Sequence, residues 1–174
     1  MFWDQWVRYF VTRDASFNSL SLDPQNPGPW TDRINQLTRL QDINSTDLSA
    51  FNQRGGKLLM AHGTADVLVS TRATAQYWQR LQQTMGAATV RGFARYYEVP
   101  GYGHAASTAF NANWDSLKAL DQWVSSGAAP ASQVVTDTAG VPGRTRPMCE
   151  YPSWPRYSGA GDVNKAESFT CVTQ

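Results

Sequence analysis

The chain has 174 residues, of which 41% are hydrophobic and 17% charged, and its formal net charge is +1. This length suits one ordinary domain, and the composition argues against a disordered chain. A near-neutral charge without a run of Lys and Arg argues against a surface that follows nucleic-acid phosphates. Because no apolar stretch reaches the roughly 18 residues of a transmembrane helix, we expect neither nucleic acid nor membrane as a partner.

The N-terminal third of the chain predicts helices separated by turns. Apolar residues with helical spacing predict a short helix over residues 2–12. Pro, Gly and Asn make residues 13–30 rich in turn signals. A second helix is expected to begin after Thr31, and a further helical turn over residues 47–51. We therefore expect residues 1–54 to form an irregular and helical lead-in.

A different pattern follows the break at Gly55-Gly56. The short apolar run over residues 57–61 is typical of a strand that is buried on both faces. A helix is expected from Ser70 to Gly86, then a strand over residues 93–99 and a helix over residues 114–124. Such alternation predicts a parallel sheet with helices on its faces. The apolar spacing assigns the buried faces of these two helices to Ala75, Trp78, Leu81 and Met85, and to Trp114, Leu117, Leu120 and Val124.

The last segment, residues 131–174, is expected to be irregular, with a short edge strand over residues 133–136. It contains both cysteines of the chain, Cys149 and Cys171. Their spacing alone leaves two interpretations open, a disulfide and two unrelated buried thiols. A disulfide suits a Gly- and Pro-rich segment that cannot hold itself by core burial, and its presence would indicate an oxidising compartment. Closing a loop of about 23 residues would contribute roughly 3 kcal/mol.

Two chemically active side chains follow the two predicted strands. Asp66 ends the sequence His62-Gly-Thr-Ala-Asp, and His104 ends Pro100-Gly-Tyr-Gly-His. In parallel sheets, functional groups lie on loops at the carboxyl ends of strands. A Ser-His-Asp triad needs a carboxylate to orient an imidazole, and α/β-hydrolases carry the acid before the histidine in the chain. We predict that Asp66 and His104 are such an acid and base.

Each of these residues also has a plainer interpretation. Asp66 follows a strand and is placed to cap the next helix, and His104 is placed to be a solvated loop histidine. His62 invites a metal interpretation, but a zinc site needs three or four ligands and the chain has two histidines and no cysteine cluster. We expect His62 to be a structural hydrogen-bonding residue at the strand end, and we expect no metal ion or cofactor.

The two loops identify a family resemblance. The stretch Gly55–Asp66 resembles the acid loop of the tannase and feruloyl esterase family, and Val99–His104 resembles its histidine loop. The resemblance runs from about Asp47 to the end of the chain and is weaker over residues 16–33. Further similarity lies in Ala109-Phe-Asn, residues 114–123, residues 127–130, residues 144–152, residues 157–162 and Phe169-Thr-Cys171.

The resemblance implies a carboxylic ester hydrolase that acts on small esters of aromatic acids, such as galloyl or feruloyl esters, by a serine-hydrolase mechanism. It implies that Asp66 and His104 are triad members and that Cys149 pairs with Cys171. It also implies secretion. Since residues 1–11 do not form a signal peptide, the expected secreted or periplasmic location depends on the disulfide and the resemblance.

The expected fold is α/β, an α/β-hydrolase-like partial parallel sheet with flanking helices and an irregular, disulfide-stapled tail. Members of the family are longer, and their nucleophile, oxyanion-hole donors and lid precede the acid loop. No G-x-S-x-G motif is present here. We therefore interpret residues 1–174 as a single C-terminal portion of an α/β-hydrolase domain, with its strand–helix core over residues 55–130. Ala105 stands where many members carry a cysteine that ties the histidine loop to the nucleophile.

Three functional hypotheses follow. The first is an ester hydrolase in which a serine from elsewhere attacks. The second is a non-catalytic or partner-dependent remnant of the fold. The third is a compact esterase that uses Ser70 or Ser107, although such serines are more often helix caps or loop residues. Because an incomplete sheet exposes an edge and an apolar face, we also expect a homo-oligomer or another association that covers them.

Overall fold

The computed structural model describes residues 2–173, and the chain divides into two compact units, Met1–Asn44 and Ser45–Gln174. Over the described range, none of the helices is long and apolar enough to cross a membrane. The expectation that the whole chain is one portion of a hydrolase domain stays a prediction.

The first unit is helical, as its apolar spacing predicts. The helix α1 (Phe2–Gln5) continues into a π-helical segment, Trp6–Val11, and the longer α2 covers Thr31–Gln41. Between them the Pro-rich stretch makes only short 3₁₀ turns, at Ser19–Ser21 and Gly28–Trp30. A small apolar core holds the unit together, with Val7, Val11, Leu22 and Leu37 buried among the rings of Trp3, Trp6, Phe17 and Trp30.

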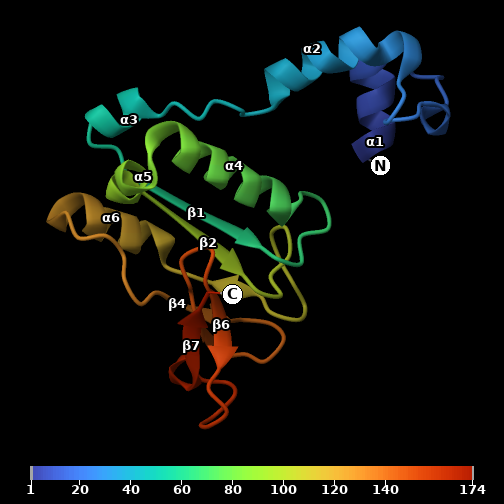
Figure 1. Ribbon diagram of the computed structural model, residues 1–174. Helices are drawn as coiled ribbons and strands as arrows, with labels where there is room; N and C mark the ends of the chain where they lie inside the picture. The colour runs from blue at the N-terminus through green and yellow to red at the C-terminus, as the bar shows by residue number, and fades with distance from the viewer. Residues whose placement is uncertain (1, 174) are drawn as a thin grey trace. The chain divides into compact units, whose positions relative to one another are not determined.

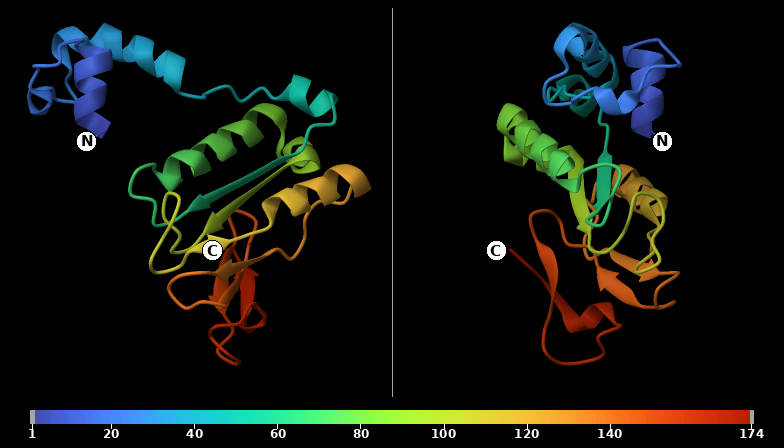
Figure 2. Two further views of the ribbon diagram at one scale, coloured as in Figure 1. Left: turned by 180° about the vertical axis from the view of Figure 1, so that it is seen from behind. Right: turned by 90° about the vertical axis from the view of Figure 1, so that its right-hand side faces the viewer.

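The centre of the second unit is a parallel pair of strands with a helix on each face. The strands β1 (Leu58–Gly63) and β2 (Ala94–Val99) pair in register from one end to the other. The helices α4 (Thr71–Met85) and α6 (Ser116–Ser126) lie on opposite sides of this pair (Figure 2, right). This arrangement confirms the predicted strand–helix–strand–helix order. Because the strands are parallel, the loops that follow them leave from the same end of the sheet (Figure 1).

The predicted buried face of α4 is confirmed. Ala75, Trp78 and Leu81 are buried against the sheet and share one apolar core with Phe93 and Tyr96. The helix ends at Gly86, where its spacing predicts a stop. Gly86 has a φ of 82° and its N–H bonds the carbonyl oxygen of Gln82, a conformation that favours glycine over residues with a β-carbon.

The predicted buried face of α6 is confirmed only in part: Trp114, just before the helix, and Leu120 are half-buried. Leu117 and Val124, which the spacing assigned to the core, are 77% and 62% exposed, whereas Ala119 and Trp123 are buried. The helix has two rows of apolar side chains. It packs inward with the row that contains Ala119 and Trp123, which combines a small side chain with a large ring. The cations of Lys57 and Arg95 lie 5.3 and 5.1 Å from the Trp123 ring centroid, which helps to explain why this face turns inward.

Two short helices differ from expectation: one was not predicted, and the other is shifted along the chain. A seven-residue helix, α5 (Ala87–Phe93), follows Gly86 directly and buries Val90 and Phe93. This helix makes fewer than two full turns before the strand, which is too short for helical spacing of apolar residues to be recognised. The predicted turn over residues 47–51 is α3 (Ser49–Gln53).

The C-terminal tail contains short antiparallel strands joined by loops. The predicted strand over residues 133–136 is β4 (Val134–Asp137), but it is a central strand and not an edge. It pairs with β3 (Ala112–Asn113) on one side and β5 (Thr145–Pro147) on the other. A separate hairpin of β6 (Trp154–Tyr157) and β7 (Phe169–Val172) follows (Figure 1).

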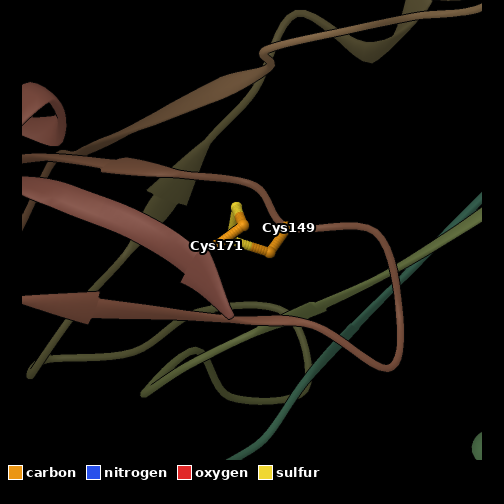
Figure 3. The surroundings of a disulfide bond; sticks show 2 residues. All are labelled: Cys149 and Cys171. Atoms are coloured by element: carbon orange, nitrogen blue, oxygen red, sulfur yellow. A yellow bond between two sulfur atoms is a disulfide. The ribbon is translucent and has the colours of Figure 1, made fainter. Parts of the chain in front are cut away.

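A disulfide between Cys149 and Cys171 staples this tail, as the family resemblance implies (Figure 3). Their Cα atoms lie 5.5 Å apart, and Cys149 is buried. The bond joins the segment after β5 to strand β7. In the chain-entropy model a loop of this length contributes about 3 kcal/mol, which offsets the small apolar core that two-stranded pairs can build.

Candidate active site

The loops that follow β1 and β2 are held against each other by backbone hydrogen bonds. The N–H of Thr64 donates to the carbonyl of Val99, and the N–H of Ala65 donates to the carbonyl of Tyr102, each at 3.0 Å. A β-carbon at Gly63 would collide with the backbone of Tyr102, so the close approach requires glycine at that position. The parallel strands and this glycine therefore bring the acid loop and the histidine loop together.

The carboxylate of Asp66 is fixed by both of its oxygens. Oδ1 accepts hydrogen bonds from the N–H groups of Leu68 and Val69, at 2.8 and 2.9 Å. Oδ2 lies 3.0 Å from Nδ1 of His104. The side chain is only 3% exposed. Asp66 does not cap α4, whose N-cap position is Ser70, so the capping interpretation is wrong. Its Oδ1 instead fixes the turn over Leu68 and Val69, while its Oδ2 points at His104.

The imidazole of His104 is held at one nitrogen and open at the other. Nδ1 bonds Asp66, the side chain is 49% exposed, and no group within residues 2–173 hydrogen-bonds Nε2. In a Ser-His-Asp triad, Nδ1 faces the carboxylate and Nε2 faces the nucleophile. The structure therefore brings the two predicted residues together in the orientation of a triad, and their catalytic role stays a prediction.

His62 is a third member of this cluster. Its Nε2 lies 3.1 Å from the same Asp66 Oδ2, and its Nδ1 lies 2.8 Å from Oγ1 of Thr74 on α4. The sequence analysis predicted that His62 forms a hydrogen bond, but not that Asp66 is its partner. The available signal was that His62 and Asp66 are four residues apart across the turn after β1. Among the described side chains, no group of three is arranged to hold a metal ion.

Hydrogen bonding lowers the pKa of Asp66. The N–H of Val69 contributes most, burial opposes it, and the N–H of Leu68 and the imidazoles of His104 and His62 add to the lowering. Together they hold the pKa of Asp66 well below its ordinary value of 3.8. Asp66 is therefore a carboxylate at neutral pH, which is the state that can orient and support an imidazolium.

The two serines of the compact-esterase hypothesis occupy different positions. The Ser107 hydroxyl donates to the Gly101 carbonyl at 3.0 Å and accepts from the N–H groups of Ala109 and Phe110. This is the geometry of a loop-fixing serine, since its proton already has a backbone acceptor. Ser70 precedes α4 without capping it and lines a cavity beside Asp66.

That cavity has a volume of about 870 Å³ and lies next to the acid loop. Its walls come from residues 67–72 together with Glu98 and Tyr151. The consecutive residues Val67, Leu68 and Val69 are large, apolar and exposed. These three side chains give a largely polar cavity, which Asp66 also lines, an apolar surface that offers contact area to a ligand.

Known proteins resemble the chain in sequence and fold. An esterase of Agrobacterium fabrum described as uncharacterized is 42% identical over 170 residues, which are 97% of this chain and 31% of that protein. A mono(2-hydroxyethyl) terephthalate hydrolase of Piscinibacter sakaiensis is 41% identical over 134 residues, covering 74% of this chain and 22% of that protein. The crystal structure of feruloyl esterase B from Aspergillus oryzae superposes with a TM-score of 0.83 at 24% identity, covering 97% of this chain and 36% of that one.

These matches show both what the chain is related to and how much of each relative it covers. The structural likeness shows an α/β-hydrolase-type fold, as predicted. The chain spans about a third or less of the length of these relatives. Residues 1–172 match the family described as tannase and feruloyl esterase. The chain belongs to the tannase and feruloyl esterase family.

Proposed function

We propose that the chain supplies the acid and the base of a carboxylic ester hydrolase that acts on small esters of aromatic acids. The observation that carries this proposal is the 3.0 Å hydrogen bond between Asp66 Oδ2 and His104 Nδ1, at the junction of the acid and histidine loops. The names of two related proteins, a terephthalate monoester hydrolase and a feruloyl esterase, support an aromatic acyl group.

The geometry defines the role of each residue in a serine mechanism. Asp66 keeps the proton of neutral His104 on Nδ1, so the lone pair of Nε2 is available to take the proton of an attacking serine hydroxyl. Asp66 then stabilises the imidazolium, which gives its Nε2 proton to the leaving alcohol. Water repeats the cycle on the acyl-enzyme and releases the acid. We propose that the serine lies outside the two loops, because Ser107 already donates to a carbonyl and, within residues 2–173, Ser70 makes no hydrogen bond to His104.

The alternative of a non-catalytic remnant is not favoured. Asp66 is buried and ionised, and it is bonded to an imidazole whose second nitrogen is open. The N–H groups of Leu68 and Val69 already hold Oδ1, and His62 already holds Oδ2, so the turn does not need His104 to satisfy the carboxylate. The additional bond to the exposed His104 has a use in proton transfer.

We also propose a secreted or periplasmic location. The Cys149–Cys171 disulfide supports it, because disulfides form and persist in oxidising compartments.

We expect the isolated chain to associate with a second copy of itself. Within the described residues, β1 pairs only with β2, so its other edge carries unpaired backbone groups. Leu117 and Val124 on α6 add exposed apolar surface. Light scattering should give a mass above that of the monomer, because a sheet edge and an apolar face are stabilised when another chain covers them. A monodisperse monomer at micromolar concentration would contradict this expectation.

A chimera tests the proposed activity. In it, this chain replaces the aligned segment of the Agrobacterium fabrum esterase, and the isolated chain is studied beside it. We expect the folded chimera to hydrolyse p-nitrophenyl esters and to acquire one fluorophosphonate adduct on a serine, seen as a single mass increment. Peptide mapping then identifies the nucleophile, and an adduct on the isolated chain would place it within residues 1–174. A folded chimera with neither turnover nor adduct would contradict the proposal.

A further inference from the structure

His62 is positioned more firmly than a strand-end residue requires. It is the penultimate residue of β1, and its side chain is 13% exposed. Both ring nitrogens are engaged, Nδ1 with the Thr74 hydroxyl on α4 and Nε2 with Asp66 on the following loop. The ring therefore connects a strand, a helix and the acid loop at one point.

The partners of His62 determine which nitrogen carries its proton. An ionised carboxylate accepts hydrogen bonds and cannot donate them, so the nitrogen facing Asp66 must carry a hydrogen. In the neutral ring this hydrogen is on Nε2, and Nδ1 then accepts a hydrogen bond from the Thr74 hydroxyl. His104 must have the opposite tautomer, with its proton on Nδ1, because that nitrogen faces the same oxygen.

The carboxylate of Asp66 consequently has four donors, two on each oxygen. Leu68 and Val69 hold Oδ1, while His62 and His104 share Oδ2. Three of these donors belong to β1 or to the loop that contains Asp66, and they hold the carboxylate in place without any contribution from His104. Since Oδ2 divides its charge between two N–H groups, each receives less stabilisation than it would from an oxygen of its own.

We propose that His62 is a positioning residue, which Thr74 orients so that its Nε2–H holds Asp66 Oδ2 toward His104 and moderates the support that Asp66 gives to the His104 imidazolium. The consequence for catalysis rests on the proposed function. A base that is supported too strongly stays protonated at neutral pH and cannot accept the nucleophile's proton. His62 holds the Asp66 carboxylate in place while taking part of the hydrogen-bonding capacity of Oδ2 away from His104.

Other titratable groups surround this cluster. Glu98 is the partner of His62 in the β1–β2 register, and its Oε1 accepts the Tyr96 hydroxyl. Arg72 and Tyr151 line the cavity that Asp66 and Glu98 also line. Among the described hydrogen bonds and ion pairs, only Asp66 and Thr74 engage the His62 ring, so a change at His62 acts on His104 through Asp66.

The composition of the chain makes this inference directly measurable. His62 and His104 are the only two histidines among the 174 residues. Long-range ¹H–¹⁵N correlation spectra of the folded, unmodified chain should therefore contain two imidazole spin systems. Above the titration range we expect the Nε2–H tautomer for His62 and the Nδ1–H tautomer for His104. An Nδ1–H tautomer at His62 would overturn the proposal without any substitution.

Two variants test the effect on His104. In His62→Leu the shared donor is lost while Leu68 and Val69 still hold Oδ1, so the His104 titration should move to higher pH by roughly one unit. His62→Gln supplies an amide donor toward Asp66 and should restore most of the original value. A His104 titration that is unchanged or lower in a folded His62→Leu chain would overturn the proposal.

These outcomes are distinguishable from failure of the proposed function. The inference about His62 can fail while His104 keeps its Nδ1–H tautomer and its bond to Asp66. If His104 instead shows the Nε2–H tautomer in the unmodified chain, the proposed acid–base pair itself is contradicted. Thr74→Val, which keeps the imidazole and removes only the hydroxyl, provides a milder variant; we expect it to shift the His104 titration in the same direction by a smaller amount.

Discussion

Replacing Asp66 with asparagine is expected to lower kcat for ester hydrolysis by roughly 10⁴-fold. Asparagine has the shape of aspartate, and its one carbonyl oxygen is claimed by the N–H groups of Leu68 and Val69. Its amide nitrogen then lies where Oδ2 was and presents hydrogens to Nδ1 of His104. His104 must move its proton to Nε2, and in that tautomer it has no lone pair for the nucleophile.

The measurement is steady-state turnover of a p-nitrophenyl ester by the chimera described above. Asp121→Asn, on the exposed surface of α6, is the matched control and should leave kcat unchanged. Far-UV circular dichroism establishes that each variant is folded. His104→Ala removes the base itself and should abolish turnover. Substantial activity in either folded variant, Asp66→Asn or His104→Ala, would rule out the acid–base assignment.

Local sequence signals were sufficient for the elements that position these two residues. A buried apolar run followed by a Gly-containing loop predicts a strand and its functional end, and this pattern occurs before both Asp66 and His104. The parallel pairing of β1 and β2 then places the two loops at one end of the sheet. The pairing joins residues that are far apart in the chain, but the order of strand, helix and strand predicts it without knowledge of the individual contacts.

The remaining features depend on contacts that have no local pattern. The helix α6 has two rows of apolar residues, and the row that packs inward contains Trp123, whose ring lies near Lys57 and Arg95 from distant parts of the sequence. The role of His62 depends on Thr74 from the next helix. The sequence pattern did not single out Asp137 either, because the groups that donate hydrogen bonds to its carboxylate come from two separate loops.

Asp137 is the second residue whose replacement should have a large effect, in this case on stability. Its side chain is fully buried at the end of β4. Oδ1 accepts from the N–H groups of Asn111, Ala139 and Gly140, at 3.0, 2.9 and 3.1 Å. Oδ2 accepts from the Val141 N–H at 2.8 Å and from Nη2 of Arg144 at 2.7 Å. One carboxylate therefore closes the loop after β4 and ties it to the segment beyond the histidine loop.

We expect Asp137→Asn to lower the melting temperature by roughly 10 °C. An amide group has one accepting oxygen, so the donors that faced Oδ2 would meet another donor. The Arg144 guanidinium, whose side chain is 19% exposed, would lose its ion pair and keep only the hydrogen bond from Nη2 to the Ala109 carbonyl. Its Nε is already buried without a hydrogen bond among the described residues. Thermal unfolding followed by circular dichroism measures the change, with Asp121→Asn as the exposed control. A decrease of only one or two degrees would contradict the assigned role.

The pH dependence of stability gives a second test of Asp137. Burial acts to raise its pKa, but the N–H groups of Val141, Ala139 and Asn111, with Arg144, outweigh burial and hold the pKa well below its ordinary value of 3.8. A carboxyl whose pKa is lower in the folded state contributes stability above its unfolded pKa, and this contribution is lost as the pH falls through the folded value. Urea unfolding of the unmodified chain should therefore become easier below about pH 4, and the Asp137→Asn chain should show a shallower acid dependence. Equal acid dependence in the two chains would mean that the Asp137 carboxylate does not stabilise the fold, because the substituted chain has no proton to bind at this position.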